Sequence, residues 1–251
     1  MSYAMTHLLV ADRFLKTHPA DNNELFMLGS IAPDAVHSRP DFTKRIKADS
    51  HCLPEEENWG EICKEAPLIK WYGRLRDFWR EKSVLASDAD TRSFLKGYTL
   101  HALTDIYNNA KFYAPCWMKF GLEDVDGFRK AYRNECIIQD NWIMHSDPEI
   151  SKTAQTLLIT TDKYDLKEII SRLGLDKFFT ADDLRLSVEY LLKEHEIDVQ
   201  VSLEGLSMVS QKSTEKFISE AENECEQILF DFPDAGRRFC IPETKDHYTG
   251  E

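Results

Sequence analysis

The sequence predicts an all-α protein. Apolar residues repeat at helical spacing in most segments, and no segment shows the strict alternation of a half-buried strand. The 251 residues include only 10 Gly and 9 Pro, which is few for an all-β protein with many turns. The hydrophobic fraction of 42% and the 14 Phe are ample for one large core. We therefore expect a single multi-helix domain over residues 1–235 and a loosely ordered tail over residues 236–251.

The first two expected helices lie close to the N-terminus. Thr6 is a favourable N-cap for a helix that runs from His7 to Lys16 and carries several apolar positions. A short helix is expected over residues 24–31, and it must stop near Pro33, because proline disfavours helical geometry in the residue before it. Asp34 follows directly, on a rigid turn.

The segment from Ala35 to Glu57 has mixed charges and no steady period. This pattern predicts a long irregular loop, and long loops in compact domains are usually functional or disordered. His51 lies inside this segment. A further loop is expected between Pro115 and Gly121. The remaining helices are expected over residues 67–82, 91–109, 124–145, 149–159, 166–173, 181–195 and 203–230.

Composition excludes several classes of function. The net charge of −13 argues against a long nucleic acid as partner, because binding a polyanion requires clustered Lys and Arg. The six cysteines form no C-x-x-C pair, so we read them as mostly buried thiols in a reducing compartment. The N-terminal residues do not resemble a signal peptide, and no stretch approaches the roughly 20 apolar residues of a membrane span. We expect a cytoplasmic protein without membrane insertion, and its oligomeric state stays open.

His101 and Asp105 are four residues apart in the expected helix 91–109, so both side chains leave one face of it. This geometry lets an imidazole nitrogen and a carboxylate oxygen reach one metal ion, as the two histidines of a zincin helix do. A surface His–Asp pair without a metal is the alternative. Three more metal-competent residues, His7, Asp34 and His51, lie in other segments, and periodicity cannot show whether the five meet in space.

The order of these residues resembles a known signature. The matching segments are Thr6-His7, Gly29-Ser30-Ile31-Ala32-Pro33-Asp34, Ser50-His51, and Gly97 with His101-x-x-x-Asp105. Together they resemble the zinc-dependent phospholipase C and single-strand nuclease superfamily, over about residues 1–140. The resemblance implies an α-helical fold with up to three zinc ions in a cleft.

By the same resemblance, one zinc would be held by Asp34, His51, His101 and Asp105. Asp105 would bridge to a second zinc bound by His7, and Asp34 and Asp105 would be the catalytic carboxylates. Two metals that share a carboxylate can clamp a phosphoryl oxygen and supply a metal-activated water.

The sequence also departs from the family pattern. Secreted members use the amino group of an N-terminal tryptophan as a ligand, whereas this chain begins Met1-Ser2. The third-site histidine that should follow the aspartate is replaced by Lys111. The nearest equivalents of the later ligand pair are Glu135 and Asp140, which lie five residues apart and converge poorly on one helix face. We therefore expect two zinc ions rather than three, with iron or manganese as possible substitutes in a carboxylate-rich site.

These observations predict a metal-dependent hydrolase of a small soluble phosphomonoester or phosphodiester. The alternative is a non-enzymatic helical protein that binds one metal or a protein partner. A phosphohydrolase of the histidine–aspartate kind is a third reading, but the chain has no adjacent His-Asp pair. The other five histidines have no partner at useful spacing, and we expect them to be solvated: His18, His37, His145, His195 and His247.

Overall fold

The computed structural model describes residues 4–54, 65–121, 124–194 and 201–231. These residues form helices and turns without a strand, which confirms the all-α prediction. The elements are α1 (Ala4–Thr17), α2 (Asn23–Gly29), η1 (Ala32–Ser38), α3 (Lys44–Ser50), α4 (Glu65–Ser83), α5 (Ala89–Asn108), η2 (Asn109–Tyr113), α6 (Ala114–Cys116), η3 (Trp117–Gly121), α7 (Val125–Ser146), α8 (Pro148–Lys163), α9 (Leu166–Arg172), α10 (Ala181–Glu194) and α11 (Gln211–Asp231).

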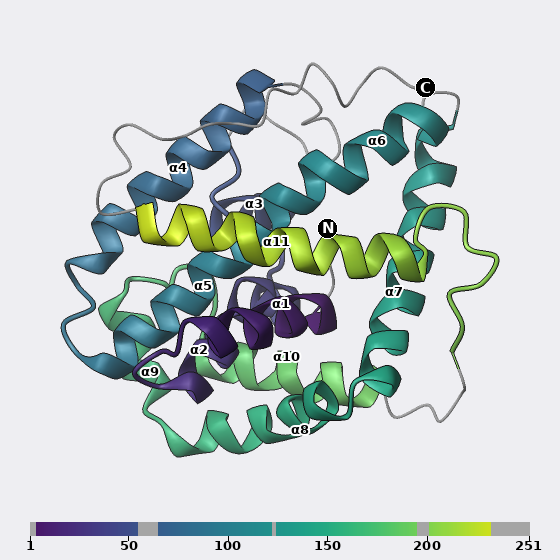
Figure 1. Cartoon of the computed structure of the whole chain (residues 1–251). Helices are drawn as coiled ribbons and strands as arrows, with labels where there is room; N and C mark the ends of the chain where they lie inside the picture. Colours follow the sequence, from purple (N-terminus) through teal and green to yellow (C-terminus); the bar gives the residue numbers. More distant parts are fainter. Residues whose placement is uncertain (1–3, 55–64, 122–123, 195–200, 232–251) are drawn as a thin grey trace.

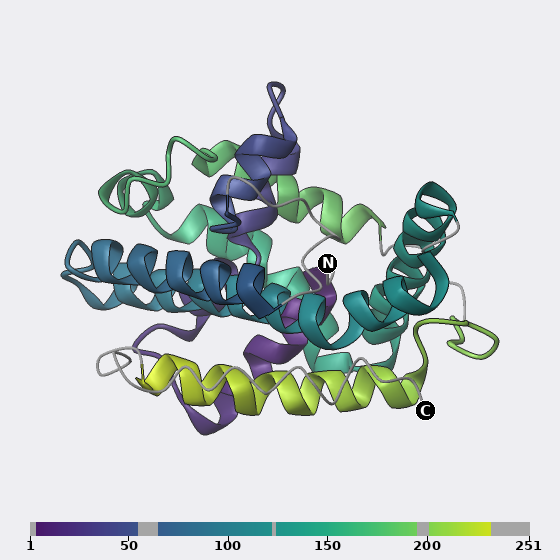
Figure 2. The same cartoon turned by 90° about the horizontal axis from the view of Figure 1, so that it is seen from above.

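Helix α5 is the centre of the molecule (Figure 1). From Ser93 to Asn108 nearly every side chain is buried, on all faces of the helix, as expected for a helix surrounded by others. Helices α2, α4 and α11 all pack against it. Figure 2 shows α4 and α5 running side by side, with α11 along one side of the molecule. Any side chain that α5 presents to these neighbours is therefore held away from bulk solvent.

Two glycines bring α2 and α5 into direct backbone contact. A Cβ atom at Gly97 would lie 2.0 Å from the carbonyl oxygen of Phe26, and one at Gly29 would lie 2.2 Å from that of Phe94. Neither approach is compatible with a side chain, so only glycine permits this packing. The close approach places the carbonyl of Ser30 at 2.8 Å from His101 Nδ1.

The segment expected to be a long irregular loop is mostly helical up to Ser50, so that prediction was wrong there. Pro33 occupies the first turn of the 3₁₀-helix η1, where its missing N–H has no intrahelical partner to lose. Thr43 caps α3 by accepting a hydrogen bond from the Ile46 amide. Both helices have seven residues, too few to show a clear period. Residues 55–57 lie outside the described part of the chain.

Two further boundaries differ from the predictions. Residues 109–121 are helical and continue α5 without a break, and Pro115 lies between the two π-helical turns η2 and η3. Helix α11 begins at Gln211 rather than near residue 203. Ser210 caps the start of α11, because its hydroxyl oxygen accepts a hydrogen bond from the Ser213 amide.

The thiols of Cys52, Cys136 and Cys225 are buried and that of Cys116 is half-buried, in line with the prediction of mostly buried thiols. Cys63, Cys240 and the expected tail over residues 236–251 lie outside the described residues. Within the described ranges, no helix combines the length and the apolar character needed to cross a bilayer.

Candidate metal centre

The five residues singled out from the sequence meet in space, although they come from four separate segments. His7 lies in the first half of α1, Asp34 in η1, and His51 directly after α3. His101 and Asp105 share one face of α5 and are buried, as are His7 and His51. Asp34 is the most exposed of the five, with 24% of its side chain accessible, against 0% for His51.

Donor atoms of four of these residues lie 3.2–3.9 Å apart in several pairs, spacings that suit ligands of one metal ion. His51 Nε2 is 3.2 Å from His101 Nε2 and 3.3 Å from Asp34 Oδ1. It is also 3.7 Å from Asp105 Oδ2, and His101 Nε2 is 3.9 Å from Asp34 Oδ2. Tetrahedral ligands about 2.0 Å from zinc are separated by about 3.3 Å. A small contraction of the longer distances would therefore complete the coordination of one ion.

Hydrogen bonds fix the orientation of both imidazoles. His101 Nδ1 lies 2.8 Å from the carbonyl oxygen of Ser30, and His51 Nδ1 lies 2.9 Å from that of Lys47. A carbonyl only accepts, so each Nδ1 carries a proton and each Nε2 is the ring atom that faces the cluster. Ligating histidines commonly donate their second N–H to a backbone carbonyl in this way.

The charge states of the cluster also favour a cation. Burial, followed by the charge of His7, lowers the pKa of His101 well below its ordinary value of 6.5, so this ring is neutral near pH 7. Burial raises the pKa of the Asp34 carboxyl, but the Lys47 ammonium and the hydrogen bond with His37 outweigh it and hold this pKa well below 3.8. Burial likewise raises the pKa of Asp105, and contacts with His7 lower it further than burial raises it. Both carboxylates are therefore ionised near pH 7 and lie beside imidazole nitrogens.

Asp105 lies between two halves of the cluster. Its Oδ2 faces His51, and its Oδ1 lies 3.5 Å from His7 Nε2. The rings of His7 and His101 stack with centroids 3.6 Å apart. The ligand atoms of these residues fall into two groups, Asp34–His51–His101 and His7–His101–Asp105.

The two groups are not equal. They share His101, whose Nδ1 is engaged by Ser30, so that only its Nε2 can ligate and only to one ion. The first group has two nitrogen donors and a carboxylate, and Asp105 Oδ2 lies beside it at 3.7 Å from His51 Nε2. Zinc accepts such nitrogen and oxygen donors. A second ion would then receive His7 Nε2 and Asp105 Oδ1 from the described residues. The described residues thus offer a more complete set of ligands for one metal ion and two protein ligands for a second.

The structure places Glu135 and Asp140 elsewhere. The Asp140 carboxylate accepts hydrogen bonds from the Met5 amide and from both the amide and the hydroxyl of Thr6, which caps the first turn of α1 from a neighbouring helix. Glu135 accepts hydrogen bonds from the amides of residues 207–209. Neither belongs to the ligand groups found among the described residues. Lys111 is half-buried in the π-helical turn η2.

Two residues at the edge of the cluster were not predicted to belong to it. Lys47 Nζ lies 3.0 Å from Asp34 Oδ1 and 2.7 Å from His37 Nε2. His37 is 47% exposed, as expected, but it is not simply solvated. Lys47 and His51 are four residues apart, the spacing that drew attention to His101 and Asp105. That spacing could have identified Lys47, had a helix been predicted over residues 44–50.

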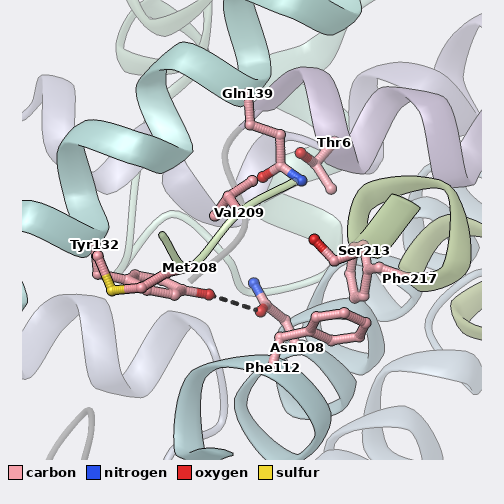
Figure 3. Close-up of a pocket in the computed structure, with 9 residues that line it drawn as sticks. All are labelled: Thr6, Asn108, Phe112, Tyr132, Gln139, Met208, Val209, Ser213 and Phe217. Atoms are coloured by element: carbon pink, nitrogen blue, oxygen red, sulfur yellow. Dashed lines mark hydrogen bonds between the residues drawn. The ribbon is translucent and has the colours of Figure 1, made fainter. Parts of the chain in front are cut away.

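A pocket lies between α1, α5, α7 and α11 (Figure 3). Its lining includes Thr6, next to His7, and Asn108, one turn beyond Asp105, whose amide oxygen is 3.4 Å from the Tyr132 hydroxyl. Its volume of about 20 Å³ is close to the space that one water molecule needs. This pocket is therefore too small for an organic ligand. At the cluster itself, Asp34 and His37 have the more exposed side chains, 24% and 47% accessible.

No protein-family model matches the chain, and searches of curated proteins and of solved structures also found no match.

Proposed function

We propose that the protein is a metal-dependent phosphoester hydrolase with a helical fold of the zinc-dependent phospholipase C type. The observation that carries this proposal is the cluster of imidazole nitrogens and carboxylate oxygens of His51, His101, Asp34 and Asp105, with distances of 3.2–3.7 Å from His51 Nε2 to the other three and with the second oxygen of Asp105 directed at His7. The order of these residues along the chain supports the choice of reaction, since it resembles the signature of that superfamily.

A divalent metal held by these residues would supply polarisation of a phosphoryl oxygen and would lower the pKa of a bound water. The residues of the chain supply the rest. His51 and His101 are held as neutral ligands by backbone carbonyls, and Asp105 fixes the spacing of the two halves. Asp34 is ionised and reached by solvent, so it can accept a hydrogen bond from the attacking water. In hydrolysis that water adds to phosphorus, the bond to the ester oxygen breaks, and the alcohol leaves with a proton.

The substrate we propose is small. The net charge of −13 disfavours extended polyanions, and His7, His51, His101 and Asp105 are at most 2% exposed. Only a compact phosphoester can present its phosphorus to ligands buried to this degree. Zinc suits the mixed nitrogen and oxygen donors, and iron or manganese would also be tolerated.

One observation favours a second candidate, a non-enzymatic protein with a structural metal. Four donors already fill a tetrahedral site, and closed four-ligand sites are typical of structural zinc, whereas catalytic sites keep a position for water. In that case the metal would stabilise the fold without reacting.

The test is hydrolysis of p-nitrophenyl phosphate and bis(p-nitrophenyl) phosphate by the zinc-loaded protein. We expect activity that a chelator abolishes and added zinc restores. Asp34→Asn and His101→Gln should lower kcat/KM by about 100-fold or more, since both remove a metal ligand. His145→Gln, an exposed histidine of α7, is the matched control and should leave activity unchanged. Full zinc occupancy without hydrolysis of either ester would instead support the structural-metal candidate.

A further inference from the structure

Lys47 is a buried cation at the edge of the metal centre. Only 7% of its side chain is exposed, and its ammonium lies against Asp34 Oδ1, the oxygen that also faces His51. Lysines are almost never buried to this degree unless they are paired. The contact with Asp34 supplies a pair, but it places the positive charge beside a carboxylate that the proposed metal also uses.

The neighbours of Lys47 place this charge on the accessible side of the centre. His37, 47% exposed, approaches the ammonium at 2.7 Å and lies one turn of η1 beyond Asp34, which is 24% exposed. The histidine ligands behind them are 0–1% exposed. Going inward from solvent, the order is therefore His37, then Lys47 and Asp34, then the imidazoles of His51 and His101. An anion that approaches the metal from solvent passes the Lys47 ammonium.

The positive charge of Lys47 contrasts with the negative net charge of the chain. With a net charge of −13 the protein as a whole repels anions. A phosphate can be retained only where local positive charge offsets that repulsion. The proposed metal and Lys47 share contact with the Asp34 carboxylate, so one phosphoryl group can place one oxygen on the metal and another beside the ammonium. Hydrogen bonds between ammonium and phosphate are among the stronger ones in proteins.

We propose that Lys47, positioned by His37, binds a terminal phosphoryl oxygen and makes phosphomonoesters the preferred substrate class of this site. A monoester carries close to two negative charges at neutral pH and has one substituent. A diester carries one charge and two substituents, which the buried ligands disfavour. The inference rests on the proposed hydrolase function. It predicts that the substrate carries a terminal phosphate group.

The test compares zinc-loaded wild type with Lys47→Gln. A matched control is Lys44→Gln, which removes an exposed lysine from the same helix. The first measurement is binding of inorganic phosphate by calorimetry, with zinc content measured on the same samples. We expect wild type and Lys44→Gln to bind phosphate alike and Lys47→Gln to bind it about 30-fold more weakly at unchanged zinc content, the loss typical of one charged hydrogen bond.

The second measurement is the ratio of kcat/KM for p-nitrophenyl phosphate to that for bis(p-nitrophenyl) phosphate. Wild type should prefer the monoester, and Lys47→Gln should reduce this preference about 30-fold by losing monoester activity. The assignment is overturned if Lys47→Gln binds phosphate as wild type does, if it lowers activity on both esters equally, or if it loses its zinc. If zinc-loaded wild type hydrolyses neither ester, the hydrolase proposal fails, and the calorimetric comparison alone decides whether Lys47 binds phosphate.

Discussion

Asp105 on α5 and Asp140 on α7 are both 2% exposed aspartates that the sequence marks as ligand candidates, yet their surroundings differ. The Asp140 oxygens lie 2.8–3.1 Å from amide and hydroxyl donors of α1, which is the range of ordinary hydrogen bonds. The Asp105 oxygens face imidazole nitrogens at 3.5 Å and 3.7 Å, beyond that range. The Asp140 carboxylate caps a helix, whereas the Asp105 carboxylate, which also interacts with His7, is grouped with the imidazoles of His7 and His101, which could share a cation with it.

The same difference separates Glu135 from Asp34. Glu135 accepts amide hydrogen bonds from residues 207–209 and holds that segment against α7. Asp34 lies among Lys47, His37 and His51. The carboxylates of α7 therefore organise the fold, and those of η1 and α5 organise the candidate metal centre. Residue type and burial do not distinguish the two roles, but the chemical nature of the neighbours does.

The largest expected effect on stability comes from the contact between α2 and α5, which positions His101. Gly97→Ala would force a Cβ atom to within 2.0 Å of the Phe26 carbonyl, so α2 must move away from α5 and the His101–Ser30 hydrogen bond is lost. We expect the free energy of unfolding to fall by about 3 kcal/mol, at the upper end of overpacking costs. Urea unfolding of the metal-free protein measures it.

Gly73→Ala is the control for that measurement. A Cβ at Gly73 meets nothing within 4 Å, and alanine favours a helix interior over glycine by about 0.5–1 kcal/mol. This variant should therefore be more stable than wild type. Equal stability of Gly97→Ala and wild type would contradict the described contact between α2 and α5.

Asp140→Ala tests whether the Asp140 carboxylate of α7 stabilises the fold and does not bind the metal. The substitution removes the acceptor for two amides of the first turn of α1 and for the Thr6 hydroxyl. We expect a loss of about 2 kcal/mol in unfolding free energy, since buried donors lose a charged partner. Elemental analysis of the folded variant should still find the metal content of wild type. Loss of metal without loss of stability would reverse the roles assigned to Asp140 and Asp105.

The smallest effect is a pH dependence of the metal-free protein. The folded-state pKa of His101 lies below 6.5 because of burial, so below that pH the unfolded chain binds more protons and stability falls as pH falls. The slope for one group approaches about 1.4 kcal/mol per pH unit. The lowered pKa values of Asp34 and Asp105 act in the same direction, but only below about pH 4.

Urea unfolding between pH 7.5 and 5 measures this slope. His101→Gln should be less sensitive to pH than wild type over that range, because the substituted side chain does not titrate. His145→Gln, which replaces an exposed ring, should keep the wild-type slope. A wild-type slope that persists in His101→Gln would assign the pH dependence to other groups.

Much of the fold was predictable because most helices are long and carry a clear apolar face. The helices that were missed or misplaced are short or begin with unusual turns. Helix α3 has only seven residues, and its start depends on a single cap at Thr43. The chain over residues 109–121 contains a proline that normally marks a break, yet here it lies within a continuous helical run, between two π-helical turns.

The candidate site was predictable where its members share an element and not where they meet by tertiary packing. The spacing of His101 and Asp105 was sufficient to pair them. The approach of His7, Asp34 and His51 was expected only from the family resemblance, because it depends on tertiary packing that no local pattern reveals; the contact of α2 with α5 at Gly29 and Gly97 is one part of that packing. The roles of Glu135 and Asp140 depend on donors from segments far away in the sequence, so only the structure could assign them.

The most direct test of the metal centre is the metal content of protein purified without chelators. Elemental analysis should find one to two metal ions per chain in wild type and in Asp140→Asn, which keeps an oxygen acceptor for α1. His101→Ala and Asp105→Ala should lose them. A wild-type protein without metal, or variants of His101 and Asp105 that retain it, would show that this cluster of imidazoles and carboxylates is not a metal centre, and the hydrolase proposal would fall with it.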